Sequence, residues 1–304
     1  MVAPLILAIT GATGFVGARL LDLALDAGHS VRALTRRLQP VRAGVVWIEG
    51  ALDLPDSLDR LVHGADAVIH VAGVINAPDA AGFEAANVIG TGAILAATEG
   101  AAIPRFVHVS SLAAREPDLS RYGASKARSE ALVAASPLST AIVRPPAVYG
   151  PGDRETLELF KMARRGQIFV PPRGRLSLLH VDELAHLLLA LAAPDAPELT
   201  IEPDDGRPGG WSHREFGDAL AQAVGSPART FAVPRWLLSL GARIDRIARG
   251  AGAKLTTDRV AYFCHPDWVV SPLRAAPPEL WTSQIDTKLG LADTARWYRA
   301  QHWL

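Results

Sequence analysis

The stretch Thr10-Gly11-Ala12-Thr13-Gly14-Phe15-Val16-Gly17 decides the fold of this 304-residue chain. An apolar run at 5–9 precedes it, and apolar residues at helical spacing follow it until Gly28. Glycines between a strand and a helix let backbone N–H groups approach a pyrophosphate at the positive end of the helix. We therefore predict a dinucleotide-binding turn whose cofactor contacts are Gly11, Thr13, Gly14, Phe15, Val16 and Gly17.

Short apolar runs continue to alternate with helical stretches as far as residue 143. The runs predicted as further strands are 31–34, 45–48, 67–71, 106–109 and 140–143. This alternation predicts an α/β fold, a Rossmann-type doubly wound parallel sheet with helices on both faces. Prolines become frequent after Gly150. We expect residues 1–150 to form the dinucleotide-binding domain and 151–304 mostly a smaller C-terminal substrate-binding lobe, interleaved with the sheet domain.

Two helices are predicted beyond the sheet strands. One spans 181–193, and the other spans 212–224 with Ser212 and Glu215 as its capping box. The first contains His180, Asp182, Glu183 and His186 at or near its start, but acids at a helix N-terminus suit the dipole and no zinc-type spacing is present. No metal site is therefore expected.

The charge balance and the single cysteine narrow the class of protein. Lys plus Arg and Asp plus Glu both number 31, so the overall charge favours no nucleic-acid partner. Cys264 alone cannot form an intramolecular disulfide, and the N-terminal apolar run is too short for a signal sequence. We expect a cytoplasmic protein.

Two arginines follow the second predicted strand, where the fold places the adenosine ribose. An acidic residue there would bind the ribose hydroxyls and select NAD, but the chain has Arg36 and Arg37. Guanidinium groups can hold a 2′-phosphate through two hydrogen bonds. NADP(H) is therefore favoured over NAD(H).

Tyr122 and Lys126 carry the strongest indication of chemistry. Residues four apart on a helix share a face, so the ammonium of Lys126 can approach the phenol of Tyr122 and lower its pKa. Such a tyrosine can exchange a proton with a substrate oxygen while a nicotinamide moves a hydride. Lysine is scarce in this chain, which makes a chance placement at this spacing less plausible.

Taken in order, the motifs resemble the extended short-chain dehydrogenase/reductase superfamily, the epimerase/dehydratase type. Besides the glycine turn and Tyr122 with Lys126, they are Ala67-Val68-Ile69-His70-Val71-Ala72-Gly73, Asn87-Val88-Ile89-Gly90-Thr91, Val109-Ser110-Ser111, Arg144-Pro145-Pro146-Ala147-Val148-Tyr149-Gly150-Pro151 and Leu179-His180-Val181-Asp182. The resemblance implies that Tyr122 is the catalytic acid/base, that Lys126 lowers its pKa and binds the nicotinamide ribose, and that Ser111 hydrogen-bonds the reacting oxygen, with Ser110 as the alternative serine.

The resemblance also assigns the remaining cofactor contacts. It places Val71, Ala72 and Gly73 at the adenosine side, Asn87 at the centre of the site, and Pro146, Ala147 and Val148 at the nicotinamide end. The family usually has Gly-Asp-Leu after the third strand, whereas this chain has Gly50-Ala51-Leu52. Adenine contacts then fall to Leu52 and the backbone, or to nearby Asp53.

Three reactions compete within this resemblance. Dehydratases carry acids directly after the catalytic serine, where this chain has Leu112-Ala113-Ala114, and nucleotide-sugar epimerases carry an asparagine where it has Ala147. The 144–153 segment looks more like the hydroxysteroid dehydrogenase and dihydroflavonol reductase branch, so we favour interconversion of a hydroxyl and a carbonyl on a small hydrophobic substrate. An NAD-dependent epimerase and a non-catalytic NADPH-binding accessory subunit are the alternatives.

An apolar stripe lies in the C-terminal half, within residues 234–249. It comprises Trp236, Leu237, Leu240, Ile244 and Ile247, with arginines beside it. We expect it to pack against the protein, and contact with a membrane is the less favoured alternative. A homodimer is common in enzymes that resemble this chain.

Overall fold

The computed structural model describes residues 3–250 and 256–304, which divide into two compact units. Unit 1 comprises Met1–Pro145, Leu184–Glu202 and Ala276–Trp281, and unit 2 comprises Pro146–Glu183, Pro203–Ala275 and Thr282–Leu304. The chain thus passes between the units several times. The domain limits 1–150 and 151–304 stay a prediction.

Unit 1 is built on a seven-stranded sheet in which every neighbouring pair is parallel. From one edge to the other its strands are β11 (Leu199–Ile201), β6 (Ser139–Val143), β5 (Arg105–Val109), β4 (Ala67–His70), β1 (Ile6–Thr10), β2 (Ser30–Thr35) and β3 (Val45–Glu49). Six of them occupy the predicted runs, which confirms the predicted fold class. The short edge strand β11 was not predicted, because its apolar run is brief and lies in a proline-rich stretch.

The strand order reverses direction between β1 and β4. Thr10 pairs with His70 at the ends of these two strands, so the glycine turn after β1 and the segment after β4 lie side by side. In sheets of this kind, ligands bind outside the carboxyl ends of the strands at the point of reversal. The fold therefore brings the predicted cofactor segments to one place.

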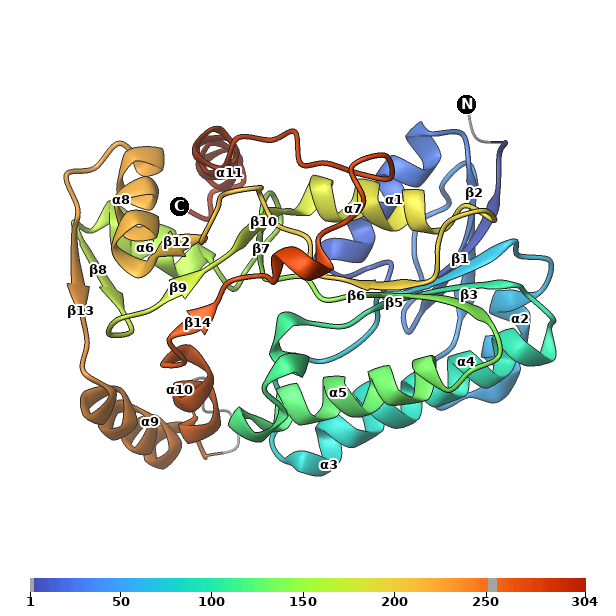
Figure 1. Cartoon of the computed structure of the whole chain (residues 1–304), viewed down its shortest axis with the longest axis horizontal. Coiled ribbons are helices and arrows are strands. Elements are labelled where there is room, and N and C mark those ends of the chain that lie inside the picture. The colour runs from blue at the N-terminus through green and yellow to red at the C-terminus, as the bar shows by residue number, and fades with distance from the viewer. Residues whose placement is uncertain (1–2, 251–255) are drawn as a thin grey trace. The chain divides into compact units, whose positions relative to one another are not determined.

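Helices cover both faces of the sheet of unit 1, with α1 and α7 on one face and α2, α4 and α5 on the other (Figure 1). The helical segments are α1 (Phe15–Asp26), α2 (Pro55–Val62), α3 (Ala80–Phe83), the π-helical turn η1 (Glu84–Ile89), α4 (Gly90–Gly100), the 3₁₀ turns η2 (Leu112–Arg115) and η3 (Pro117–Leu119), α5 (Arg121–Ala134) and α7 (Val181–Leu191). Buried residues of the sheet and of α2, α4 and α5 form one apolar core, including Val68, Leu61, Ile94, Phe106 and Val133.

The continuous helical run 80–100 is both long and apolar. By length and composition it could cross a membrane, and among the described residues it is the one helix that could. Its buried Asn87 and Thr91 are hydrogen-bonded within unit 1. We therefore interpret it as a core helix of the sheet unit.

Unit 2 combines three small sheets with helices. The sheets pair β7 (Ala147–Tyr149) with β10 (Leu178–His180), β8 (Gln167–Val170) with β13 (Arg229–Ala232), and β9 (Arg175–Leu176) with both β12 (Trp211–Ser212) and β14 (Asp267–Trp268). The helical segments are α6 (Leu157–Arg164), α8 (His213–Val224), α9 (Arg235–Arg249), α10 (Thr257–Phe263), η5 (Pro272–Arg274) and α11 (Thr287–Ala300).

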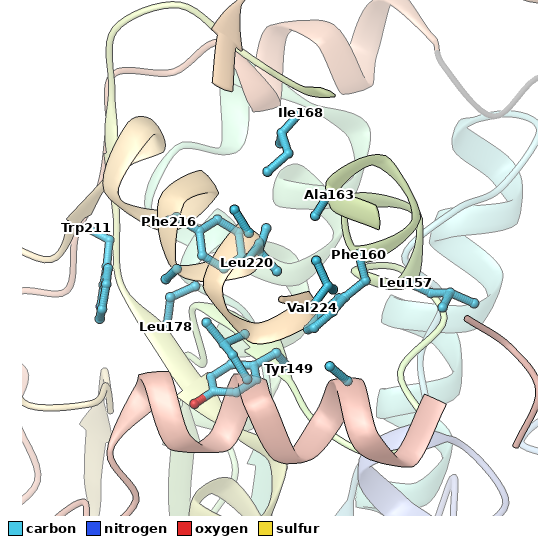
Figure 2. Packing of buried hydrophobic residues seen from close by; sticks show 14 of the residues in the cluster. Tyr149, Leu157, Phe160, Ala163, Ile168, Leu178, Trp211, Phe216, Leu220 and Val224 are labelled. Carbon is cyan, nitrogen blue, oxygen red and sulfur yellow. The ribbon is translucent and has the colours of Figure 1, made fainter. Parts of the chain in front are cut away.

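The core of unit 2 lies between α6, α8 and α11, where Figure 2 shows Phe160, Phe216 and Leu220 converging. Tyr149 and Tyr298 are fully buried at its edge, and the Tyr298 hydroxyl donates to the carbonyl of Asp153 at 2.6 Å. Helix α8 begins with the predicted capping box: Ser212 accepts from the N–H of Glu215, whose carboxylate accepts from the N–H of Ser212. The predicted helix is confirmed.

Candidate active site

The glycine turn after β1 packs its backbone closely against the segment after β4. Gly11 has φ +74°, and a Cβ there would lie 2.7 Å from the backbone nitrogen of Ala72. A Cβ on Gly17 would lie 2.1 Å from the Gly11 carbonyl oxygen. Because a side chain at either position would displace backbone, glycine is required here. The turn is thus held against Val71 and Ala72.

The start of α1 presents backbone donors beside this turn. Gly14 is the N-cap and makes no side-chain cap, while Thr13 and Gly14 are exposed and Phe15 and Val16 are half-buried. The first N–H groups of a helix have no partner within the helix and lie at the positive end of its dipole. An anionic group such as a pyrophosphate fits this position.

Asn87 fixes the strand-end loop that follows β4. Its amide nitrogen donates to the Val74 carbonyl at 3.0 Å and to Ser125 Oγ at 2.9 Å, and its oxygen accepts from the Val74 N–H at 2.7 Å. The residue lies in the π-helical turn η1 and is 1% exposed. It therefore ties the loop that contains Gly73 to helix α5.

Tyr122 lies in the first turn of α5, opposite the loop that carries Ser111. Ser120 caps this helix by accepting from the N–H of Gly123, and a Cβ on Gly123 would lie 2.6 Å from the Ala113 carbonyl oxygen. This close approach brings the two segments together. The Ser111 side chain hydrogen-bonds the phenol of Tyr122.

Burial and this hydrogen bond act in opposite directions on Tyr122. Burial of the phenol, whose ring lies beside Phe83, raises its pKa, and the hydrogen bond from Ser111 lowers it. The two effects together raise the pKa of Tyr122 above its usual value. This differs from the prediction that Lys126 lowers the pKa of Tyr122. The reason is that the helical spacing of the two residues says nothing about how deeply the phenol is buried. The hydroxyl is protonated at neutral pH.

Lys126 is buried one helical turn further along α5. Its ammonium donates to the Val109 carbonyl at 2.8 Å and lies 3.5 Å from the position that a Cβ of Gly73 would occupy. Burial lowers the pKa of Lys126 to about 8, and the nearby carboxylate of Glu130 opposes this shift. The amine therefore lies between Gly73, Asn87 and the end of β5, and it is charged at neutral pH.

Glu130 links the lysine to a buried polar network that sequence reasoning missed. Its carboxylate accepts a hydrogen bond from Ser110 Oγ at 2.5 Å and forms an ion pair with Arg144 at 2.6 Å. Arg144 also forms an ion pair with Glu202 at 3.3 Å. The hydrogen bond to Glu130 raises the pKa of Arg144. Ser110 thus bonds Glu130, whereas the Ser111 side chain caps η2 by accepting from the N–H of Ala113 and lies at Tyr122. Glu130 follows Lys126 by four residues, and that spacing was the available signal.

Two stacked histidines lie in the sheet next to this network. His70 and His108 have ring centroids 5.5 Å apart; His70 hydrogen-bonds Thr10 and Thr91, and His108 hydrogen-bonds Ser129. Burial, with the charge of Lys126, lowers the pKa of His70 to about 3 and that of His108 well below its usual value. Both rings are neutral at physiological pH, and their hydrogen bonds join neighbouring strands and helices of unit 1.

The end of β2 lies at an open cavity of about 460 Å³ in unit 1. Arg36 and Arg60 both line it, together with Glu49, Gly50, Ala51 and Leu54. Arg37 is exposed next to Arg36, and Leu52 is half-buried with its side chain against Gly90. Arg60 was not predicted because it lies on α2, remote from the glycine motif in sequence; it also donates to the Glu49 carbonyl at 2.9 Å.

Pro146, Ala147 and Val148 belong to unit 2, where Ala147 and Val148 lie in β7. Ala147 is exposed, and the other two are half-buried. Their predicted contact with the nicotinamide stays a prediction.

The residues of unit 1 fit a bound nicotinamide dinucleotide. The close backbone packing of the glycine turn fixes the start of α1, α1 supplies backbone donors for phosphate, and Arg36 with Arg60 supplies cationic groups at the cavity beyond β2. A protonated phenol and a buried ammonium follow at the end of β5. This set can bind a dinucleotide and give a proton to a substrate oxygen.

Comparison with known proteins agrees with this geometry. Residues 7–200 match the model of the NAD dependent epimerase/dehydratase family. The chain is 38% identical to the ceramide reductase of Caulobacter vibrioides, with 98% of this chain and 96% of the relative covered. It is 30% identical to the 2-alkyl-3-oxoalkanoate reductase of Stenotrophomonas maltophilia, over 89% and 85% of the two chains. Among solved structures, MoeE5 in complex with UDP-glucose and NAD superposes with a TM-score of 0.75 at 22% identity, covering 98% of this chain and 99% of MoeE5, and shows a shared fold.

Proposed function

The chain belongs to the NAD dependent epimerase/dehydratase family and is an NAD(P)-dependent oxidoreductase of the extended short-chain type, and from this premise we propose that it reduces a ketone on a lipophilic substrate with NADPH. The observation that carries the proposal is the placement of Tyr122 in the first turn of α5, beside the loop that carries Ser111 and one helical turn before the buried Lys126. A protonated phenol suits donation to a developing alkoxide, the proton step that ketone reduction requires.

Each residue has a distinct task in this scheme. Ser111 orients the carbonyl oxygen and Tyr122 gives it a proton. Lys126, charged below pH of about 8 and placed between Gly73 and the end of β5, binds the nicotinamide ribose. A nicotinamide cofactor, when bound, supplies the hydride to the carbonyl carbon.

Asn87 and Glu130 act through these three residues. Asn87 holds the loop at Gly73 and the first turns of α5, and Glu130 keeps a negative charge near the buried ammonium. Without Glu130 the pKa of Lys126 would fall further, because burial is then unopposed. Both residues therefore position or charge the groups that react.

NADP(H) is the proposed cofactor rather than NAD(H). Arg36 and Arg60 line one cavity at the end of β2, and Arg37 stands exposed beside them. A 2′-phosphate is the group on an adenosine ribose that two or three guanidinium groups would recognise. The same cavity is also lined by Ala51, which has no acidic side chain, and by one acid, Glu49, against the two arginines.

The proposed substrate is a 3-oxo lipid. One relative is named for ceramide and another for a 3-oxoalkanoate, and both are named as reductases. The shared chemistry is reduction on a molecule with an apolar chain. Ala147 and Leu112, which replace the residues used by epimerases and dehydratases, support reduction over those reactions.

A substrate panel tests this proposal. Purified protein is mixed with NADPH or NADH and with a 3-oxo-sphingolipid, a 2-alkyl-3-oxoalkanoate, or UDP-glucose, and cofactor oxidation and products are followed. We expect NADPH oxidation with at least one 3-oxo lipid and formation of its alcohol. Epimerisation of UDP-glucose, or tight NADPH binding with no turnover on the whole panel, would contradict the proposal and favour the epimerase or the accessory subunit respectively.

A further inference from the structure

Helix α9 leaves its most apolar stripe exposed. Trp236, Leu240, Ile244 and Ile247 follow one another at intervals of four, four and three residues, so they share one face of the helix. Their side chains are 68%, 46%, 58% and 86% exposed, and Leu237 beside them is 43% exposed. The expected packing of this stripe against the protein is therefore not seen, and Ala242 is the one residue of α9 that is buried.

Arginines flank this stripe on the same helix. Arg235, Arg243, Arg246 and Arg249 are exposed, and Asp245 is the single acidic residue, so α9 carries a net charge of +3 (four arginines less one aspartate). The whole chain has a formal net charge of +0. Positive charge is thus concentrated next to an exposed apolar stripe on an otherwise neutral protein.

The strand pair that leads into α9 exposes further aromatic surface. Phe231 on β13 and Phe169 on β8 are 44% and 47% exposed, and their rings stack at 5.9 Å. Residue 231 precedes α9 by four positions, and Figure 1 shows β13 running directly into the helix. The apolar surface of unit 2 is therefore larger than the helix alone.

We propose that α9 docks on an anionic membrane surface, with its apolar stripe at the boundary between headgroups and acyl chains and its arginines on lipid phosphates. A helix with a strongly apolar face, low net hydrophobicity, a tryptophan and a basic flank lies in such an interface. Arginines beside the stripe supply charge complementarity to anionic headgroups. Phe231 and Phe169 would add apolar contact.

A second copy of this chain is a poorer occupant of the same surface. A twofold interface would bring the α9 arginines of one protomer close to the same residues of the other, and like charges that meet in an interface are repelled. An anionic bilayer instead satisfies the apolar stripe and the arginines together. This inference goes beyond the proposed reaction and does not depend on it, since its readout is binding rather than turnover.

Vesicle flotation with the full-length protein tests the docking. Vesicles of phosphatidylcholine alone are compared with vesicles that also contain phosphatidylglycerol, at low and high salt. We expect at least about tenfold more bound protein on the anionic vesicles at low salt, and loss of that excess at high salt, because exposed charges are screened. Absence of binding to anionic vesicles would overturn the proposal.

Paired variants separate docking from general surface effects. Arg243→Glu with Arg246→Glu, and separately Trp236→Ser with Ile247→Ser, should each reduce binding at least about tenfold. The matched controls are Arg164→Glu with Arg165→Glu on and after α6, and Leu289→Ser on α11, whose side chain is 67% exposed. These controls should bind as the unaltered protein does, and thermal melting verifies that every variant is folded.

Two further results would contradict the docking. One is equal loss of binding in the controls and in the α9 variants, which would make the attraction non-specific. The other is a concentration-dependent dimer, seen by sedimentation, that the Trp236→Ser and Ile247→Ser double variant converts to monomer, because the stripe would then be covered by a second copy.

Discussion

Cations lie in opposite environments in two regions of the molecule: they are buried in the polar centre of unit 1 and exposed on helix α9 of unit 2. Lys126 is 5% exposed and donates to the Val109 carbonyl, with Glu130 and Arg144 bonded to each other nearby. The arginines of α9 are exposed, as is the apolar stripe beside them. In the first arrangement burial lowers the pKa of the cation, whereas in the second both the cations and the apolar side chains face solvent.

The sharpest way to test this contrast is removal of the phenol that the buried centre supports. Tyr122→Phe should lower the turnover number roughly 100- to 10,000-fold, the usual contribution of a positioned proton donor. Binding of NADPH should change little, because the ring and its packing against Phe83 remain. Steady-state kinetics and a fluorescence titration measure the two effects. Retention of turnover would remove Tyr122 from the chemistry.

The cost of burying Lys126 makes a pH-dependent prediction about stability. Its pKa in the folded protein is about 8, below its ordinary value of 10.5, so its contribution to stability is present above pH 10.5 and is lost as the pH falls through about 8. Lys126→Met abolishes this dependence. As the pH falls from 10.5 to neutral, the free energy of unfolding of the Lys126→Met variant should rise by about 3 kcal/mol relative to that of the unaltered protein.

Denaturant unfolding at several pH values measures that difference. Arg128→Met, an exposed cation two residues further along α5, serves as the matched control and should show no such change. A constant difference between Lys126→Met and the unaltered protein across the pH range would show that the lysine is not buried as described.

The glycine turn allows a comparison between two glycines that share a positive φ. Gly11 and Gly28 have φ values of +74° and +83°, but a Cβ on Gly11 would lie 2.7 Å from backbone while one on Gly28 would meet nothing within 4 Å. Gly28→Ala should therefore cost about 1 kcal/mol from backbone strain alone. Gly11→Ala should cost about 1 to 3 kcal/mol more through overpacking. Equal losses in denaturant unfolding would mean that the turn does not pack tightly against Ala72.

The smallest expected effect concerns the choice of cofactor. Arg36→Ala and Arg60→Ala should each weaken NADPH binding about tenfold and leave NADH binding nearly unchanged, because a charge-assisted hydrogen bond to phosphate is lost. Arg42→Ala is the control, since its guanidinium pairs with Asp22 at 2.7 Å. Parallel fluorescence titrations measure the affinities. Equal weakening of both cofactors would argue against recognition of a 2′-phosphate.

Local sequence predicted the parts of the molecule that depend on local geometry. The glycine turn, six of the seven sheet strands and the Ser212 capping box follow from residue type and spacing within short windows. The three small sheets of unit 2 were not predicted, because they arise from pairings between distant segments.

The same limit explains what was missed in the site. Glu130 lies on α5, while Arg144 follows β6 and Glu202 follows β11, so the three meet only in the folded chain. The direction of the pKa shift of Tyr122 was wrongly predicted because it depends on burial. Periodicity identified the amphipathic character of α9 but not which face is covered, so its exposure became visible only in the structure.

Isotope transfer tests the central claim most directly. NADPH carrying deuterium at the reactive position of its nicotinamide ring is incubated with the protein and a 3-oxo lipid, and the product is examined by mass spectrometry. Reduction as proposed places one deuterium on the carbinol carbon of the product, and Tyr122→Phe slows its appearance without changing its position. An alcohol product that lacks deuterium, or no alcohol product from any 3-oxo lipid that binds, would contradict the account.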